Sequence, residues 1–295
     1  MKISEFYKKG IRTFSFEFFP PKTEEGELKL FETIRELKRL DPSFVSVTYG
    51  AMGTTRQNTL RIVSKVRSEL GIESAAHLTC VGHTSEEIRA VLHDLKARGV
   101  CNVVALRGDP PKGETQFRPV PGGFHYAAEL VRFIRSEPEF RDHFSLAVAG
   151  YPETHVECRD PVKDLDHLKR KVDAGADLVV TQLFFDNRDF FDFVHRARKA
   201  GIAIPIVAGI MPVTHGPQIE RFAQMCGAKI PASMRESILR LGEDQAAVEA
   251  FGVEYATRQC AELLKEGVSG IHFYTLNKSR ATLEIYQNLG LAKLR

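Results

Sequence analysis

Short apolar segments alternate along the chain with longer segments of helical periodicity. The short segments are rich in β-branched and aromatic residues, and such nearly continuous hydrophobic runs are typical of parallel strands covered on both faces. They span residues 14–19, 44–49, 75–80, 102–107, 145–151, 178–185, 205–211 and 270–276. In the longer segments, apolar residues recur at helical spacing and charged residues occupy the opposite face. These helices are expected over residues 24–40, 55–70, 85–98, 126–135, 162–174, 188–199 and 217–226.

Local signals mark the ends of several helices. Glycine stands where a helix should end before the next strand at Gly71, Gly99, Gly175 and Gly201. Thr84 and Glu87 have the spacing of a capping box, which predicts a helix start. An additional helical segment over residues 231–267 precedes the last strand, and a final helix is expected over residues 278–289.

Eight strand–helix units predict an α/β protein, a single (β/α)8 TIM barrel with an extra helical insert before strand eight. The alternative is a doubly wound open sheet, which would place a glycine-rich GxGxxG turn after the first strand. Residues 19–22 read Phe-Pro-Pro-Lys instead, which favours the barrel. No linker composition interrupts the pattern, so residues 1–295 are expected to form one domain.

Composition and charge exclude several classes of protein. The chain is 43% hydrophobic and 27% charged, and its formal net charge of +3 gives no electrostatic basis for binding nucleic acid. No stretch approaches the roughly 18 consecutive apolar residues of a membrane helix, so no membrane association is expected. The five cysteines are odd in number and lack CxxC spacing, which predicts reduced thiols in a cytoplasmic protein. The ten histidines form no HExxH pattern, and no metal site is expected.

Polar residues gather where the strands end, which is where a barrel of this kind places its active site. Glu17 lies in the first strand between Phe16 and Phe18. Loss of solvation among these aromatic rings is expected to raise the pKa of Glu17, which suits proton donation near neutral pH. Two alternatives remain open: a Lys or Arg partner that holds the carboxylate, or a carboxylate that reaches solvent at the strand end.

Three further groups are candidates for ligand binding. Arg107-Gly108-Asp109 ends the fourth strand and offers a glycine for close backbone approach to a ligand, or an internal ion pair that braces the loop over residues 109–123. Gln182 can donate and accept hydrogen bonds to a ligand, or it is a satisfied core amide. Asp164, His167 and Lys171 share one helical face, with Arg170 adjacent, and this face suits phosphates and ribose hydroxyls or is an ordinary charged surface.

Eight blocks of the sequence together resemble methylenetetrahydrofolate reductase of the bacterial type. They span residues 14–22, 44–50, 76–79, 105–109, 151–155, 168–175, 181–186 and 272–277, and the resemblance covers nearly the whole chain. The resemblance implies a TIM barrel that holds FAD non-covalently and reduces 5,10-methylenetetrahydrofolate to 5-methyltetrahydrofolate. It also implies a nicotinamide, NAD(P)H, as electron donor in a ping-pong reaction, and a homo-oligomer, either a dimer or a tetramer.

The resemblance assigns roles to individual residues. Glu17 matches the general acid that protonates the folate, Asp109 matches an aspartate that binds the pterin and stabilises the developing cation, and Gln182 matches a residue that hydrogen-bonds the pterin edge. Tyr274 and Lys278 complete the expected substrate site. The expected FAD contacts are Thr48, Tyr49, Ala51, His77, Arg107, Gly108, Asp109, Tyr126, Ala149, Tyr151, His155, Asp164, His167, Arg170 and Lys171, with His167 standing where the family usually has asparagine.

The sequence departs from the family pattern after the seventh strand. Gly216 stands where the family commonly has an aromatic residue on which nicotinamide and folate rings stack, and His215 is its neighbour. His215 is a candidate replacement; without one, the nicotinamide binds weakly or electrons come from a protein partner. The S-adenosylmethionine-binding regulatory domain of eukaryotic members is not expected in these 295 residues.

Two other functions remain as alternatives. One is a different flavin barrel of the proline dehydrogenase type, which would need arginines near strand eight, where Tyr274 and Asn277 stand. The other is a flavin-free pterin-binding methyltransferase or a folate-binding module, in which the charged helix over residues 164–171 would have no role.

Overall fold

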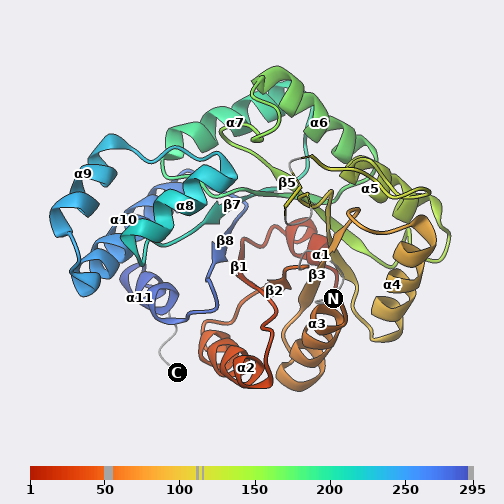
Figure 1. The fold of residues 1–295 in the computed structure, drawn as a ribbon, viewed down its shortest axis with the longest axis horizontal. Helices are drawn as coiled ribbons and strands as arrows, with labels where there is room; N and C mark the ends of the chain where they lie inside the picture. Colours follow the sequence, from red (N-terminus) through yellow and green to blue (C-terminus); the bar gives the residue numbers. More distant parts are fainter. Residues whose placement is uncertain (50–55, 111–112, 115, 292–295) are drawn as a thin grey trace.

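Eight parallel strands form a closed barrel in the computed structural model, which describes residues 1–49, 56–110, 113–114 and 116–291 (Figure 1). Each strand pairs with the next in sequence, and the last pairs with the first. The strands are β1 (Thr13–Phe18), β2 (Phe44–Val47), β3 (Ser74–Thr79), β4 (Asn102–Leu106), β5 (Ser145–Gly150), β6 (Leu178–Thr181), β7 (Ile206–Ile210) and β8 (Gly270–Tyr274). The predicted barrel is therefore confirmed.

Helices form a ring around the strands. They are α2 (Glu24–Lys38), α3 (Arg56–Leu70), α4 (Ser85–Ala97), α5 (Ala127–Ser136), α6 (Pro161–Asp173), α7 (Asn187–Lys199), α8 (Gly216–Cys226) and α11 (Arg280–Asn288). The predicted insert before β8 consists of α9 (Ala232–Leu241) and α10 (Gln245–Lys265). The main core lies between the ring and the barrel, where outward-facing Phe16 and Phe18 pack with Leu30 and Ile34 of α2.

A short N-terminal helix closes the end of the barrel at which the strands begin. The periodicity did not indicate this helix. This helix, α1 (Ile3–Lys8), buries Ile3 among inward-facing strand residues such as Phe44 and Val104. The backbone N–H of Ile3 donates to Asn102 Oδ1 at 2.8 Å, and that of Ser4 donates to Ser145 Oγ at 3.1 Å. Six residues are too few to show helical periodicity, so this helix could not be predicted from the hydrophobic pattern.

The predicted helix ends are confirmed at the level of backbone conformation. Gly71, Gly99, Gly175 and Gly201 all have positive φ, between 66° and 113°. Thr84 and Glu87 form the capping box, with Glu87 N–H donating to Thr84 Oγ1 at 3.2 Å and Thr84 N–H donating to Glu87 Oε2 at 2.9 Å.

The sixth strand is shorter than predicted. It ends at Thr181, and the apolar run continues outside the sheet because Leu183 and Phe185 pack into a second cluster with residues of α8, α9 and α10. A buried apolar run does not reveal by itself where the sheet ends. In the described part of the chain, no helix has the length and apolar character needed to cross a bilayer.

Candidate active site

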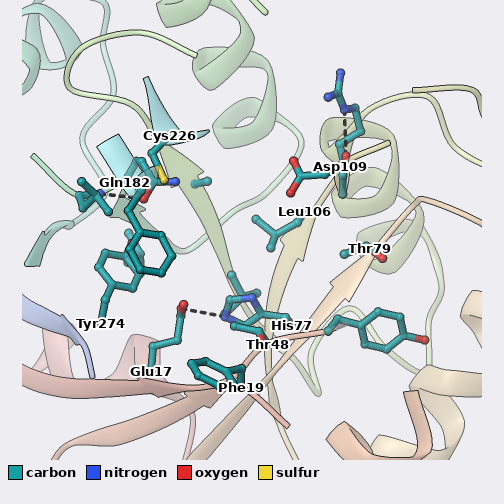
Figure 2. Close-up of a pocket in the computed structure, with 18 of the residues that line it drawn as sticks. Glu17, Phe19, Thr48, His77, Thr79, Leu106, Asp109, Gln182, Cys226 and Tyr274 are labelled. Atoms are coloured by element: carbon teal, nitrogen blue, oxygen red, sulfur yellow. Dashed lines mark hydrogen bonds and ion pairs between the residues drawn. The ribbon is translucent and has the colours of Figure 1, made fainter. Parts of the chain in front are cut away.

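A cavity of about 480 Å³ lies at the carboxyl ends of the strands (Figure 2). Its wall combines residues from most of the strand ends with two residues of α8, Phe222 and Cys226. Because side chains alternate along a strand, Glu17 of β1, His77 of β3 and Tyr274 of β8 point into the barrel while their neighbours face the helices. This is the location predicted for the active site.

Glu17 stands in a cluster of polar side chains inside the barrel. Its Oε2 atom lies 3.2 Å from His77 Nε2 and 3.3 Å from His272 Nε2, and it accepts a hydrogen bond from Ser46 Oγ at 3.3 Å. The side chain of Glu17 retains 18% of its exposure, on the side of the cavity. Figure 2 shows the contact between Glu17 and His77 at the floor of the cavity.

The prediction that burial raises the pKa of Glu17 is wrong for the ligand-free protein. Burial acts in that direction, but the charges and hydrogen bonds of His77 and His272 outweigh it and hold the pKa well below its usual range. The physical reason is that the side chains of Phe16 and Phe18 point outward, toward the helices. The carboxylate of Glu17 points inward and lies beside imidazoles instead of phenyl rings. The Lys or Arg partner considered as an alternative is also not what holds Glu17, because the ionisable side chains in contact with its carboxylate are histidines.

His272 is a site residue that the sequence analysis did not single out. It is 2% exposed, and its Nδ1 atom lies 2.7 Å from Ser15 Oγ in a hydrogen bond. The sequence held a usable signal, because strand alternation places His272 on the same face as Tyr274. Ser15 and Glu17 share the inner face of β1, so the cluster extends from the cavity floor into the barrel.

Arg107, Gly108 and Asp109 have different partners from those expected. Both terminal nitrogens of Arg107 donate to the carboxylate of Glu157 at 2.6 Å, so Arg107 does not form the brace with Asp109 considered from the sequence. Gly108 has φ of +88°, and a Cβ there would lie 2.6 Å from Val81 Cγ1. Glycine is therefore required both by the backbone conformation and by the contact with Val81. Asp109 is exposed at the cavity wall, and its carboxylate has no hydrogen-bond partner among the described residues.

The three residues expected to bind substrate after β6 and β8 occupy different positions. Gln182 lines the cavity, and its Oε1 accepts from the backbone N–H of Leu183 at 2.9 Å. Tyr274 also lines the cavity, but its hydroxyl donates to the Thr181 carbonyl at 2.6 Å, so its ring forms a fixed wall. Lys278 is exposed and is not part of the cavity wall formed by the described residues.

The residues expected to contact FAD separate into two groups. The first group lines the cavity: Thr48, Tyr49, His77, Arg107, Gly108, Asp109, Ala149, Tyr151 and His155. The second group lies on α6 and at the start of α5, outside the cavity wall: Tyr126, Asp164, His167, Arg170 and Lys171. Ala51 lies outside the described residues.

The second group forms a surface that continues from the cavity. Lys171 Nζ donates to the carbonyl of Ala149 at 2.6 Å and lies 5.7 Å from the centre of the Tyr151 ring, and both of these residues line the cavity. Burial lowers the pKa of Lys171 to about 8. His167 and Tyr126 place their rings 6.5 Å apart on the outer side.

Two charged groups of α6 already have partners. Arg170 forms an exposed ion pair with Asp166 at 2.7 Å. Asp164 is buried, and burial raises its pKa although the charge of Lys171 opposes this shift.

One buried hydroxyl in the cavity wall supports a polar ligand. Thr79 Oγ1 is buried and has no hydrogen-bond partner within the described ranges. A buried polar atom without a partner costs free energy, so such atoms mark places where a ligand or water completes the bonding. The Thr79 hydroxyl is therefore available to a polar group of a ligand in the cavity.

The segment after β7 does not supply the stacking ring considered from the sequence. His215 caps α8, because its Nδ1 accepts from the backbone N–H of Gln218 at 3.3 Å, and Gly216 is the first residue of the helix. Neither is among the described residues that line the cavity. Two phenyl rings to which the sequence assigned no site role, Phe19 and Phe222, do line it.

Comparison with known proteins shows the family of the chain. A family model described as "Methylenetetrahydrofolate reductase" matches residues 2–290. The chain belongs to the methylenetetrahydrofolate reductase family. It is 42% identical over 299 residues to "Methylenetetrahydrofolate reductase (NADH) 1" of Arabidopsis thaliana, an alignment that covers 98% of this chain and 50% of the relative. It is 39% identical over 277 residues to "5,10-methylenetetrahydrofolate reductase" of Escherichia coli, covering 94% of this chain and 90% of that one.

Methylenetetrahydrofolate reductases therefore include relatives of two lengths. The chain spans about half the length of the plant relatives and most of the length of the bacterial one. Among solved structures, an uncharacterised protein from Clostridium thermocellum that binds two copies of 5-methyl-5,6,7,8-tetrahydrofolic acid superposes with a TM-score of 0.60 at 16% identity, covering 99% of this chain and 97% of that one. Phosphonopyruvate hydrolase gives 0.52 at 14% identity, covering 97% and 85%. These structural matches show the barrel fold alone.

Proposed function

We propose that this protein reduces 5,10-methylenetetrahydrofolate to 5-methyltetrahydrofolate, with FAD as its cofactor and Glu17 as the proton donor. The observation that supports this most directly is the carboxylate of Glu17 at the cavity floor, backed by His77 and His272. This places an ionisable side chain that can exchange a proton with a ligand at the wall of the cavity.

The cavity and α6 would hold FAD. Bound FAD would supply the hydride-transfer chemistry between the donor and the folate. The first group of residues would surround its ring system, and the orphaned Thr79 hydroxyl offers a hydrogen bond there. Lys171, Arg170 and Arg107 supply positive charge for the pyrophosphate, which this fold needs because it has no glycine-rich loop.

Glu17 protonates the folate so that its five-membered imidazolidine ring opens to a reactive iminium. Without folate, the contacts with His77 and His272 hold the pKa of Glu17 well below its usual range. A bound folate displaces water from the cavity, which strengthens the burial effect and moves the pKa of Glu17 upward. Glu17 then takes up a proton and delivers it to the substrate in the cavity that it lines.

Asp109 and Gln182 orient the substrate. The Asp109 carboxylate, which has no partner within the described residues, is available to a pterin N–H and stabilises positive charge on the iminium. The Gln182 amide is fixed by Leu183 and presents its remaining hydrogen-bonding capacity to the pterin edge. Tyr274 shapes the cavity, and Lys278 would contact only a part of the folate that extends outside it.

The electron donor in this proposal is NADH or NADPH. The name of the plant relative specifies NADH for that protein, and a protein donor is the alternative because Gly216 and His215 do not line the cavity. The proposal also places the protein in the cytoplasm as a dimer or tetramer, with residues 1–295 acting as one catalytic domain. These assignments rest on the family resemblance and on the reduced state expected for the cysteines.

Anaerobic stopped-flow spectroscopy tests the proposal. The oxidised protein is mixed with NADH or NADPH while the flavin absorbance is followed, and the reduced protein is then mixed with 5,10-methylenetetrahydrofolate. We expect bleaching in the first step and recovery in the second. Failure with both nicotinamides moves the donor to a protein partner. A protein with no flavin absorbance, and none after FAD is added, would instead be a flavin-free pterin-binding methyltransferase or folate-binding module.

A further inference from the structure

Phe19 is an aromatic side chain exposed at the cavity, next to the proposed acid. The two phenylalanines before it, Phe16 and Phe18, are buried in the core under the helices. Phe19 follows Glu17 by two positions, on the inner face of the chain, and it is 45% exposed where it lines the cavity. Figure 2 shows its ring beside Glu17. An exposed phenyl ring in a cavity is suited to contact a flat apolar ligand group.

The turn after β8 holds this strand end by its backbone. Phe19 N–H donates to Asn277 Oδ1 at 3.0 Å, and Asn277 Nδ2 donates to the Phe19 carbonyl at 2.9 Å. Thr275 Oγ1 also donates to the carbonyl of Glu17 at 2.7 Å. One turn therefore fixes the backbone at both the acid and the aromatic ring, and we call these three hydrogen bonds the 275–277 clasp.

The clasp requires an unusual backbone. Leu276 and Asn277 have φ of 52° and 57°, in the left-handed region that non-glycine residues rarely adopt. For a leucine this conformation is strained, and strain of this kind is concentrated at ligand sites, where the surrounding structure imposes it. Leu276 lines the cavity as well, so the same turn also places an apolar side chain on the wall.

The tyrosine rings of the wall already have partners. Tyr49 bonds to His83 Nε2 at 3.1 Å through its hydroxyl, and the Tyr274 hydroxyl donates to Thr181. Tyr151 is packed edge-on by His155, with ring centres 4.7 Å apart, and carries Lys171 over its ring. Phe222 lies on α8 and lines both the cavity and a neighbouring pocket. Phe19 is the exposed ring adjacent to the acid.

We propose that Phe19 is the stacking surface for the aminobenzoyl ring of the folate, and that Asn277 is the positioning residue that fixes it there. This inference rests on the proposed function. Ring opening protonates and releases the folate nitrogen that bears the aminobenzoyl group. A proton from Glu17 therefore reaches an atom attached to that ring, and Phe19 is an exposed aromatic ring near Glu17 in the cavity wall. The chain thereby gains a stacking surface although Gly216 offers none.

Four variants test the proposal in the full-length flavoprotein. Phe19→Leu removes the aromatic ring, whereas Phe19→Tyr keeps an aromatic ring at this position. Asn277→Gly removes both hydrogen bonds to Phe19 while relieving the left-handed backbone. Asp41→Gly is the matched control, because Asp41 has a similar φ of 52° in the turn after α2, away from the cavity. The two half-reactions are measured separately, together with FAD content and Tm.

Phe19→Leu and Asn277→Gly should each raise the KM for 5,10-methylenetetrahydrofolate about tenfold, the effect of losing one aromatic stacking contact with its buried area. Reduction of the flavin by the nicotinamide should stay within about twofold of the wild-type rate in both. Phe19→Tyr and Asp41→Gly should resemble the wild type in both half-reactions.

Wild-type KM in both Phe19→Leu and Asn277→Gly would overturn the proposal while leaving the proposed function intact. Equal losses in both half-reactions, with a lower Tm or FAD content, would also overturn it by showing a structural role. Absence of folate reduction by the wild-type protein would instead overturn the proposed function, and this inference with it. The wild-type trace therefore separates the two failures.

Discussion

At the scale of single residues, a buried carboxyl pair fastens the loop that presents Tyr151 and His155 to the cavity. The side chain of Glu153 is 4% exposed, and both of its oxygens accept from the backbone N–H of Lys229, at 3.1 and 3.0 Å. Asp189 of α7 faces it as a like charge and hydrogen-bond partner, and Lys229 Nζ lies 4.0 Å away. In the same loop, the backbone carbonyl of Pro152 accepts a hydrogen bond from Arg196 of α7.

Glu153 should make stability depend on pH. Burial and the charge of Asp189 raise its pKa to about 7, although the Lys229 contacts oppose the shift. The pKa of Glu153 in the folded protein is above the unfolded value of 4.5. Its contribution to the free energy of unfolding is therefore fully present below about pH 4.5 and is lost as pH rises toward 7. Thermal melts of the wild type and of Glu153→Gln between pH 5 and 8 should show a decline with pH that is smaller in the variant. Parallel curves would contradict this.

The sequence located the acid but not its environment. Glu17 could be found because a carboxylate within an apolar strand is conspicuous. Its pKa could not be predicted, since His77 and His272 reach it from strands 60 and 255 positions away. The contact between Phe19 and Asn277 could not be predicted for the same reason, because it spans 258 positions of sequence.

At the scale of elements, α1 should contribute to stability without affecting catalysis. Ile3 is 1% exposed at the lower end of the barrel, opposite the cavity. Ile3→Ala removes buried apolar volume that rigid strands cannot fill, so it should lower the free energy of unfolding by about 2–5 kcal/mol. Ile11→Ala, at a position that is 44% exposed, is the control and should cost much less. Urea denaturation measures both, and a change in either half-reaction for Ile3→Ala would contradict the assignment.

Most elements could be predicted because their signals are local. Helix ends at Gly71 and Gly175 depend on a residue at the end itself, and β4 and β7 are nearly continuous apolar runs. The exceptions depend on tertiary packing. Helix α1 forms against the barrel floor, and the run after β6 leaves the sheet because Leu183 and Phe185 pack against the insert.

At the scale of the whole molecule, the proposed FAD site extends from the cavity to the surface of α6. FAD should therefore raise the Tm of cofactor-depleted protein, with a stabilisation of about 2.7 kcal/mol at a hundredfold excess over its Kd. Riboflavin, which lacks phosphates, should give a smaller shift. Arg170→Gln should reduce the shift with FAD and leave that with riboflavin unchanged, because Arg170 is exposed on α6 outside the cavity wall. No shift of the wild type with FAD would contradict a flavin site.

The fold and the family were predictable because the strand-end motifs are distributed around the entire barrel. The electron donor was not, since discrimination between NADH, NADPH and a protein depends on the shape of the cavity mouth. The structure gives Gly216 and His215 a role that the sequence did not indicate, because Gly216 begins α8 and His215 caps it.

The most direct test of the account is the behaviour of Glu17→Gln in the two half-reactions. Glutamine keeps the size of the side chain but cannot donate a proton to open the folate ring. Reduction of the flavin by the donor should remain within about threefold of wild type, and reoxidation by 5,10-methylenetetrahydrofolate should fall by about 10²–10⁴-fold, the usual contribution of a general acid. Glu25→Gln on the exposed face of α2 is the control. Equal loss of both half-reactions, or undiminished reoxidation, would contradict the role of Glu17 as the proton donor.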